Sequence, residues 1–203
     1  MQNFSGPKSA MPSSLAMSIF GDRSSQFIDR LKWDLCVTPD GCEVDEYDDE
    51  NSIYLTVHDR CEHLGSCRVR HCSSSTMLVD HFLDSFPEAE TFMKMQRGRV
   101  YELTRFCRNP DITVDQSRLM LGQLACMLDR FREDTQITGY VAVVFPQVAR
   151  FLDTIGVRYL LVSKSTIGEN AAYLICITHA KNNKLLSLLT TSSKTPSKLS
   201  LAA

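Results

Sequence analysis

The sequence predicts a single α/β domain, a three-layer sandwich in which helices cover both faces of a mixed sheet. Two features support this prediction. The β-like runs at residues 53–58 and 64–71 are joined only by the polar residues 59–63, a pattern typical of a β-hairpin. From residue 100 onward strand-like and helical segments alternate, and this alternation indicates an α/β sandwich with antiparallel strands in front of it.

Composition limits the classes of protein that the chain can be. Its 203 residues are 43% hydrophobic and 23% charged, enough to bury the core of one globular domain. The net charge of -2 argues against nucleic acid or an anionic membrane as a partner. No run approaches the roughly 18 apolar residues of a membrane span, so we expect no membrane anchor. Without an apolar signal segment at the start, we expect a cytoplasmic protein with reduced cysteines.

Both ends of the chain differ in composition from its middle. Residues 1–16 are rich in Ser, Pro, Met and Ala without periodicity, so we expect a disordered or extended lead. Residues 17–180 should form the single domain. Residues 181–203 should form a polar tail, because their Ser, Thr, Lys and Pro content cannot build a core.

The first helix should begin at a cap supplied by Asp22 or Ser24 and carry Phe27, Ile28 and Leu31 on one side. After a turn at residues 39–41 the hairpin follows. Residues 100–107 suggest a third strand, which the Asn-Pro-Asp sequence at 109–111 ends. A long helix with an apolar stripe should then start at Asp115.

The last third of the chain completes the sheet. Residues 140–145 are nearly all apolar, which suits a strand covered on both faces. Pro146 fits the first turn of a helix that runs to Ile155, and Gly156 can end it. Residues 157–163 and 173–178 are the remaining strands.

Charged and aromatic side chains form two runs that the apolar pattern does not explain. One contains Arg23, Phe27 and Trp33 and is followed by the acidic segment at 43–50; the other is residues 101–106. Taken alone, the acidic segment is also typical of an exposed loop, and 101–106 of a solvated edge strand. Trp33 is either a core anchor or a group that stacks on a purine or faces a cation.

Glu102 and Arg105 raise a geometric question. Side chains alternate along a strand, so these two should point to opposite faces. A bulge, or a sheet splayed into a V, would let both reach one cleft. If they do, buried charges of this kind need partners or a polar ligand.

No metal site is expected. His and Cys residues crowd the hairpin at positions 58–72, but their spacing fits no standard zinc pattern and strand alternation scatters them. Neither of the two glycine-rich nucleotide-binding motifs is present. No cysteine is paired with a histidine in the way that an activated nucleophile requires.

Four motifs together resemble one family. Arg23-x3-Phe27-x5-Trp33, Asp45-x2-Asp48, Gly65-Ser66-Cys67-Arg68 and Glu102-x-Thr104-Arg105-Phe106 occur in the order found in the acyl-homoserine-lactone synthases, the autoinducer synthases of bacterial quorum sensing. Each motif is weak alone, but the ordered set is specific, and the resemblance runs from about residue 23 to residue 173. It implies an N-acyltransferase (GNAT)-like fold with a mixed, V-splayed sheet.

The resemblance also implies the reaction. An acyl group from acyl carrier protein, or from coenzyme A as the alternative donor, acylates the amine of S-adenosylmethionine. The carboxylate then displaces methylthioadenosine and closes the lactone. S-adenosylmethionine is a substrate, and no cofactor is expected. The [QR]-x-x-G-x-[GA] pyrophosphate loop of coenzyme-A-using acetyltransferases is missing, which favours the carrier protein as donor.

Roles for individual residues follow from the matched motifs and from composition. The catalytic group implied by the resemblance is Glu102, Arg105, Asp45, Asp48 and Arg68. The S-adenosylmethionine group is Arg23, Phe27, Trp33 and Thr104. The expected acyl-chain pocket is Met77, Phe82, Met120, Leu121, Ala142, Val143 and Phe145. The candidate carrier dock is Arg97, Arg99, Arg150, Lys164, Lys181 and Lys184.

Two points stay open at this stage. Ala142 falls where some members carry a threonine that accompanies 3-oxo acyl chains, so an unsubstituted or 3-hydroxy chain is indicated; chain length cannot be predicted. Two other functions also fit the fold. They are a coenzyme-A-dependent N-acetyltransferase of another amine and an inactive relative that acts as a binding module.

Overall fold

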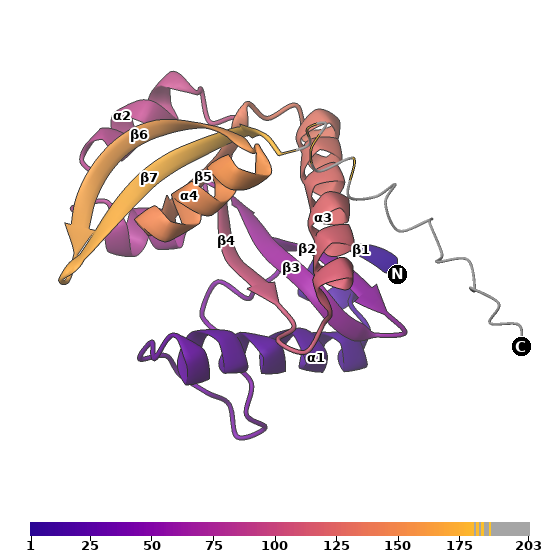
Figure 1. The fold of residues 1–203 in the computed structure, drawn as a ribbon. Helices are drawn as coiled ribbons and strands as arrows, with labels where there is room; N and C mark the ends of the chain where they lie inside the picture. The colour runs from indigo at the N-terminus through magenta and orange to yellow at the C-terminus, as the bar shows by residue number, and fades with distance from the viewer. Residues whose placement is uncertain (181, 183, 185–186, 188–203) are drawn as a thin grey trace, which may run out of the picture.

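The computed structural model describes residues 1–180, 182, 184 and 187. Within these residues the chain forms a seven-stranded sheet in the order β1-β2-β3-β4-β5-β7-β6 (Figure 1). The pair β4–β5 is parallel, and the other neighbours are antiparallel. The strands are β1 (Gln2–Gly6), β2 (Ser52–Asp59), β3 (Glu62–His71), β4 (Val100–Arg108), β5 (Gly139–Val144), β6 (Arg158–Ile167) and β7 (Asn170–His179).

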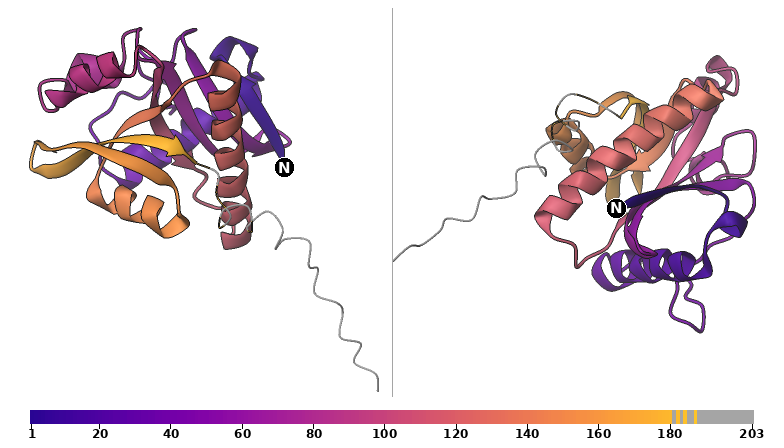
Figure 2. Two further views of the ribbon diagram at one scale, coloured as in Figure 1. Left: turned by 90° about the horizontal axis from the view of Figure 1, so that it is seen from above. Right: turned by 90° about the vertical axis from the view of Figure 1, so that its right-hand side faces the viewer.

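Helices cover both faces of the sheet, which gives the three predicted layers (Figures 1 and 2). They are α1 (Ser13–Arg23), α2 (Glu88–Met95), α3 (Val114–Thr135) and α4 (Pro146–Ile155), with a 3-10 turn η1 (Lys8–Ala10) and two π-helical segments, η2 (Ser24–Arg30) and η3 (Leu78–Phe82). The helices α3 and α4 lie on one face, and α1, η3 and α2 lie on the other. In the described part of the chain, no helix has both the length and the apolar character that crossing a membrane requires.

The sheet opens between β4 and β5. These strands pair only where residues 100–102 meet residues 139–141, although both continue beyond that point. The predicted V-shaped splay is therefore present, and it exposes backbone groups of β4 on the side of β5.

Side-chain alternation sorts the apolar residues into separate cores. On β5, Tyr140 and Ala142 belong to the large core under α3, whereas Val141 belongs to the core that contains Leu78 and Phe86. A third core joins α1 to Tyr54 of β2. Alternate residues of one strand thus face different helices, as expected for a sheet covered on both faces.

Most predicted elements are confirmed. The hairpin is β2–β3, the third strand is β4, and α4 spans the predicted residues 146–155, with Gly156 in the left-handed conformation (φ 78°) that ends it. The long helix begins at Val114, with Thr113 and Gln116 forming a capping box.

The predicted start of the first helix is wrong. Helix α1 begins at Ser13, because Leu15 and Ile19 pack into the core beneath it, and it continues through η2 without a cap at Asp22 or Ser24. The lead at residues 1–16 is extended only in part: β1 pairs with β2, and α1 starts before residue 16. Helix α2 was not predicted.

Candidate active site

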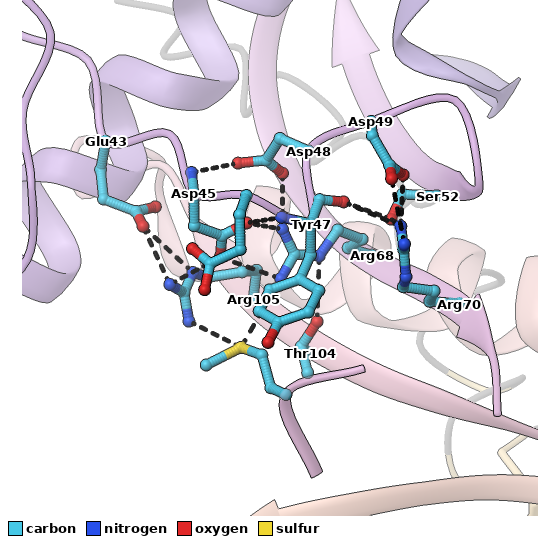
Figure 3. A network of polar contacts seen from close by, with 12 residues as sticks. Glu43, Asp45, Tyr47, Asp48, Asp49, Ser52, Arg68, Arg70, Thr104 and Arg105 are labelled. Atoms are coloured by element: carbon cyan, nitrogen blue, oxygen red, sulfur yellow. Dashed lines mark hydrogen bonds and ion pairs between the residues drawn. The ribbon is translucent and has the colours of Figure 1, made fainter. Parts of the chain in front are cut away.

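Three arginines and three carboxylates form one buried cluster between the end of α1, the loop that follows η2, and the strands β3 and β4. Figure 3 labels the three acids together with Arg68 and Arg105. The arginines are Arg23, Arg68 and Arg105, and the acids are Glu43, Asp45 and Asp48. The formal charges balance. This balance allows the cluster to lie in the interior, since an unpaired charge there would be expensive.

Arg23 is the last residue of α1 and is only 1% exposed. Its Nη1 and Nη2 donate to the two carboxylate oxygens of Asp48 at 2.9 and 3.0 Å, and its Nε donates to Glu43 at 2.5 Å. This bidentate geometry fixes the end of the helix against the acidic loop.

Arg68, on β3, links the acidic loop to β4. It donates to Asp48 at 2.7 Å, to both oxygens of Asp45, and through Nε to the hydroxyl of Thr104 at 3.2 Å. Burial alone would raise the pKa of Asp48, but its ion pairs with Arg23 and Arg68 hold that pKa well below the usual range.

A bulge brings Arg105 into the same cluster. In the β3–β4 ladder Ser66 faces Cys107 and Arg68 faces Thr104, so two β4 residues, at 105 and 106, lie opposite one residue of β3. Arg105 has a positive φ of 51°. Its Nη2 lies 3.0 Å from Glu43 and 2.8 Å from Asp45, so the bulge resolves the question of opposite faces.

Glu102 lies at the edge of this cluster. Its carboxylate accepts hydrogen bonds from the backbone N–H of Leu78 (2.7 Å) and of Met77 (3.1 Å). The Sδ atom of Met77 contacts both Arg68, at 3.6 Å, and Arg105, at 3.5 Å. Met77 therefore connects Glu102 to the arginines.

Burial raises the pKa of Glu102 to about 7, although the backbone N–H donors and the charge of Arg68 pull it down. A carboxyl group with this pKa changes its protonation state near neutral pH. Such a group is suited to proton transfer.

The two aromatic residues of the first motif stack on each other. The rings of Phe27 and Trp33 are 5.0 Å apart and nearly parallel, and the guanidinium of Arg105 lies 5.5 Å above Phe27. Phe145, from the far side of the splay, meets Trp33 edge-on at 6.4 Å. The aromatic pair thus lies next to the charged cluster.

The sequence-based list omitted several residues of the cluster. Glu43, in the acidic segment, bridges Arg23 and Arg105, and Tyr54 donates to Asp48. Beside the cluster, Arg70 holds Asp49, and both Arg68 and Arg70 lie over the ring of Tyr47. The available signals were register and spacing: Arg70 follows Arg68 by two residues on one strand face, and Tyr54 pairs with Arg68.

The expected acyl-pocket residues do not form one group. Met120, Leu121 and Ala142 belong to the core under α3, whereas Phe82 and Val143 belong to the core on the opposite face. Met77 lies between the arginines and Phe145 lies beside Trp33, as described above. The splay separates these sets, and side-chain spacing in the sequence does not show where it lies.

The candidate dock residues are also spread. Arg97 and Arg99 are exposed after α2, and Arg150 is exposed on α4. Lys164 lies over the ring of Tyr173, at 5.3 Å, and Lys184 donates to the carbonyl of Thr154. Lys181 lies outside the described residues.

The arrangement can hold a zwitterionic, cationic ligand beside an ionisable carboxylate and next to open strand backbone. The fold is similar to those of solved structures. The structure matches a putative N-acetyltransferase from Lactobacillus plantarum with a TM-score of 0.53 and 14% identity, over 86% of this chain and 94% of that one. The fold is therefore GNAT-like.

The family model assigns the chain more narrowly than the fold does. Residues 9–185 match the family model described as autoinducer synthase, and the chain belongs to this family. Its members are acyltransferases that make acyl-homoserine lactones from S-adenosylmethionine and an acyl donor. This confirms the family suggested by the four motifs.

Solved structures agree in fold. The acyl-homoserine lactone synthase BjaI, described as coenzyme-A-dependent and solved with S-adenosylmethionine and isopentyl-coenzyme A, matches with a TM-score of 0.70 and 19% identity, over 96% of this chain and 89% of that one. The synthase LasI matches with a TM-score of 0.67 and 19% identity, over 97% and 98%. No curated protein matches the sequence.

Proposed function

We propose that this synthase takes its acyl group from acyl carrier protein, and that Glu102 and the arginine–carboxylate cluster carry the chemistry on S-adenosylmethionine. The observation that carries the proposal is the position of Glu102. It is a buried carboxylate with a pKa of about 7, connected through Met77 to Arg68 and Arg105.

Charge supports binding of S-adenosylmethionine at this position. The substrate carries a sulfonium, an ammonium and a carboxylate, hence one net positive charge. The three arginines and three acids balance each other, so ionised Glu102 supplies the matching negative charge. Phe27 and Trp33 provide an aromatic surface for the sulfonium or the adenine.

The first chemical step is amide formation. A free α-amine has a pKa of roughly 8, so a carboxylate with a pKa of about 7 can accept its proton with little energetic mismatch. The neutral amine then attacks the thioester carbonyl and the C–N bond forms. The C–S bond breaks, and the departing thiolate takes the second proton from the nitrogen. Backbone N–H groups of β4 beyond Glu102, where β5 no longer pairs, are suited to stabilise the oxyanion.

The second step is lactonisation. The substrate carboxylate attacks the carbon next to the sulfonium, the C–S bond breaks, and methylthioadenosine leaves. This step is intramolecular, so the protein needs only to hold the folded conformer. Arg68 and Arg105 hold Asp45 here, and we assign them, with Asp48, to orienting the substrate rather than to covalent catalysis.

The start of α3 favours the carrier protein over the nucleotide of coenzyme A. A helix N-terminus binds phosphate when its N–H groups are free and uncompensated. Here the Thr113 N–H is bonded to Gln116, the Gln116 N–H to Thr113, and the Asp111 N–H to Asn109. Asp111 and Asp115 add negative charge at the same end. The site is therefore poorly suited to a pyrophosphate.

Coenzyme A remains the second candidate donor because two matched solved structures, BjaI and MesI, are described as coenzyme-A-dependent. Their identities to this chain are 19% and 12%. We further propose that the acyl chain is unsubstituted or 3-hydroxy, since the small Ala142 offers no hydroxyl to a 3-oxo group. We place the enzyme in the cytoplasm, where both substrates occur.

The decisive experiment supplies the purified protein with S-adenosylmethionine and matched pairs of acyl-carrier-protein and acyl-coenzyme-A donors. Each pair carries the same unsubstituted, 3-hydroxy or 3-oxo chain. Mass spectrometry should detect acyl-homoserine lactone and methylthioadenosine in equal amounts, with the higher kcat/KM for the carrier donor. Preference for coenzyme A would overturn the donor assignment. Acylation of other amines without any lactone would overturn the proposal.

A further inference from the structure

A buried hydrogen-bonded chain outside the charged cluster joins α1 to β3. The Nδ1 atom of His63 lies 2.7 Å from a carboxylate oxygen of Asp22, and its Nε2 lies 2.9 Å from the hydroxyl of Ser66. The backbone N–H of His63 donates to the hydroxyl of Ser18, one turn before Asp22 on α1. Because a carboxylate only accepts, Nδ1 of His63 carries a proton.

A second bulge makes this chain possible. Gly65 faces Val57 and His63 faces His58, so β3 has an extra residue at position 64. In a regular strand His63 and Ser66 would point to opposite faces. The bulge turns both toward α1, as the bulge in β4 turns Arg105 toward the acids.

The order Asp–His–Ser is that of a hydrolase triad, but the surroundings argue against a nucleophile. The residue exposures are 0% for His63 and 2% for Ser66, and α1 packs directly over β3. No side of the Ser66 hydroxyl is open to a substrate. The hydrogen-bonded chain instead holds helix α1 against β3.

One turn further along, Gln26 makes a second connection from the same helix. Its Nε2 donates to the carbonyl of Phe106 at 2.8 Å, and its Oε1 accepts from the N–H of Arg108 at 3.3 Å. The first contact is to the backbone of the bulge itself, and the second is to the β4 backbone just beyond it. A single amide side chain thus takes the place of a neighbouring strand.

These two connections to the sheet lie next to the two residues of this helix that are proposed to contact S-adenosylmethionine. Asp22 precedes Arg23, which enters the charged cluster, and Gln26 precedes Phe27, which stacks on Trp33. We propose that the Asp22–His63–Ser66 chain and Gln26 are positioning residues that fix the α1–η2 helix, so that Arg23 and Phe27 meet S-adenosylmethionine in one orientation. This inference rests on the proposed function, because the ligand is that substrate.

The main test uses Gln26→Leu, which removes both contacts to β4 from a half-buried position where folding is tolerant. We expect KM for S-adenosylmethionine to rise about 3- to 10-fold, which corresponds to the loss of one or two hydrogen bonds. The value of kcat should change less than about twofold. Hydrogen exchange of residues 24–33, measured without substrates, should accelerate by a similar factor. His63→Leu should do the same if it folds. The matched control, Asp29→Asn, changes an exposed residue of η2 and should leave both readouts unchanged.

A second control separates positioning from general stability. Leu128→Ala removes packing on α3, on the other face of the sheet, and should lower Tm without raising KM for S-adenosylmethionine. The proposal is overturned if Gln26→Leu leaves exchange and KM within twofold of wild type, or if Leu128→Ala raises KM equally. If the wild type makes no lactone, the proposed function fails. Hydrogen exchange of residues 24–33 still decides whether Gln26 and the Asp22–His63–Ser66 chain fix the α1–η2 helix.

Discussion

Arg105 and Asp45 form an ion pair of 2.8 Å only because β4 has one more residue than β3 at the bulge. Without it, the Arg105 side chain would point toward the core under α3, away from the acids. The left-handed conformation of a non-glycine residue costs on the order of 1–3 kcal/mol. The bulge therefore strains the backbone locally but lets the charge of Arg105 be compensated. Loss of any one member of the cluster should lower the free energy of unfolding.

We expect Asp48→Asn to lower the free energy of unfolding by about 3–5 kcal/mol, because it leaves Arg23 and Arg68 partly uncompensated in the interior. Urea denaturation measures this loss. Asp134→Asn removes an exposed i,i+4 pair on α3 and should cost less than about 1 kcal/mol. Equal losses in the two variants would show that the cluster is not electrostatically coupled.

Glu102→Gln should lower kcat by about 10²- to 10⁴-fold while the protein stays folded, because a glutamine cannot accept the amine proton. Lactone formation followed by mass spectrometry gives the rate, and circular dichroism checks the fold. Glu90→Gln, on the exposed side of α2, is the control and should retain full activity. Turnover near the wild-type value in Glu102→Gln would remove Glu102 from the mechanism.

The raised pKa of Glu102 also predicts a pH effect on stability. The folded protein keeps a proton on Glu102 up to about pH 7, whereas the unfolded chain releases it near 4.5. Between these values the folded state binds more protons, so its stability falls as pH rises. The difference in unfolding free energy between wild type and Glu102→Gln should decline through this window and level off above it. A pH-independent difference would contradict the raised pKa.

Much of the strand pattern was predictable from the sequence, and the bulges were not. Apolar alternation gives the strand faces, and Pro146 and Gly156 mark α4 through local backbone preferences. A bulge depends on which residue of the partner strand is skipped, and that is a tertiary property. Strand alternation left a bulge near Arg105 as one of two solutions, but it did not show that the bulge occurs or that His63 would pair with Ser66.

Some site residues could likewise be predicted from the sequence, and others could not. The resemblance of the motifs to the family implied Arg23, Arg68, Asp48 and Arg105, and the need of charges within apolar segments for partners agrees with it. The composition of the acidic segment at 43–50 did not show that Glu43 would bridge two arginines, since an acidic loop is more often solvated. The acyl pocket stays a prediction, because its lining depends on where the sheet opens.

Gly65→Ala should destabilise the protein by about 1–3 kcal/mol, because a Cβ at Gly65 would overlap the side chain of Met120 in the core. Gly21→Ala offers the matched comparison. No atom lies within 4 Å of a Cβ at Gly21, which is inside α1, so that change should stabilise by about 0.5–1 kcal/mol. Thermal unfolding compares them, and shifts of the same sign would contradict the packing argument.

The carrier dock predicts a salt effect on one substrate only. Raising ionic strength from about 0.01 to about 0.1 M shortens the screening length roughly threefold, so KM for acyl carrier protein should rise while KM for S-adenosylmethionine stays constant. Arg150→Glu, on α4, and Arg99→Glu, in the connection between α2 and β4, then show which of the two regions docks. A salt-independent KM for the carrier would count against every basic residue proposed for the dock.

The opening between β4 and β5 has a consequence for how the enzyme can vary. In the proposed mechanism the groups offered to the thioester there are main-chain amides, which substitution does not remove, while the surrounding apolar side chains are free to change size. In this mechanism oxyanion stabilisation and acyl preference are carried by different parts of the polypeptide. A single replacement in the apolar lining can alter the signal molecule that a cell emits and leave the bond-forming machinery intact.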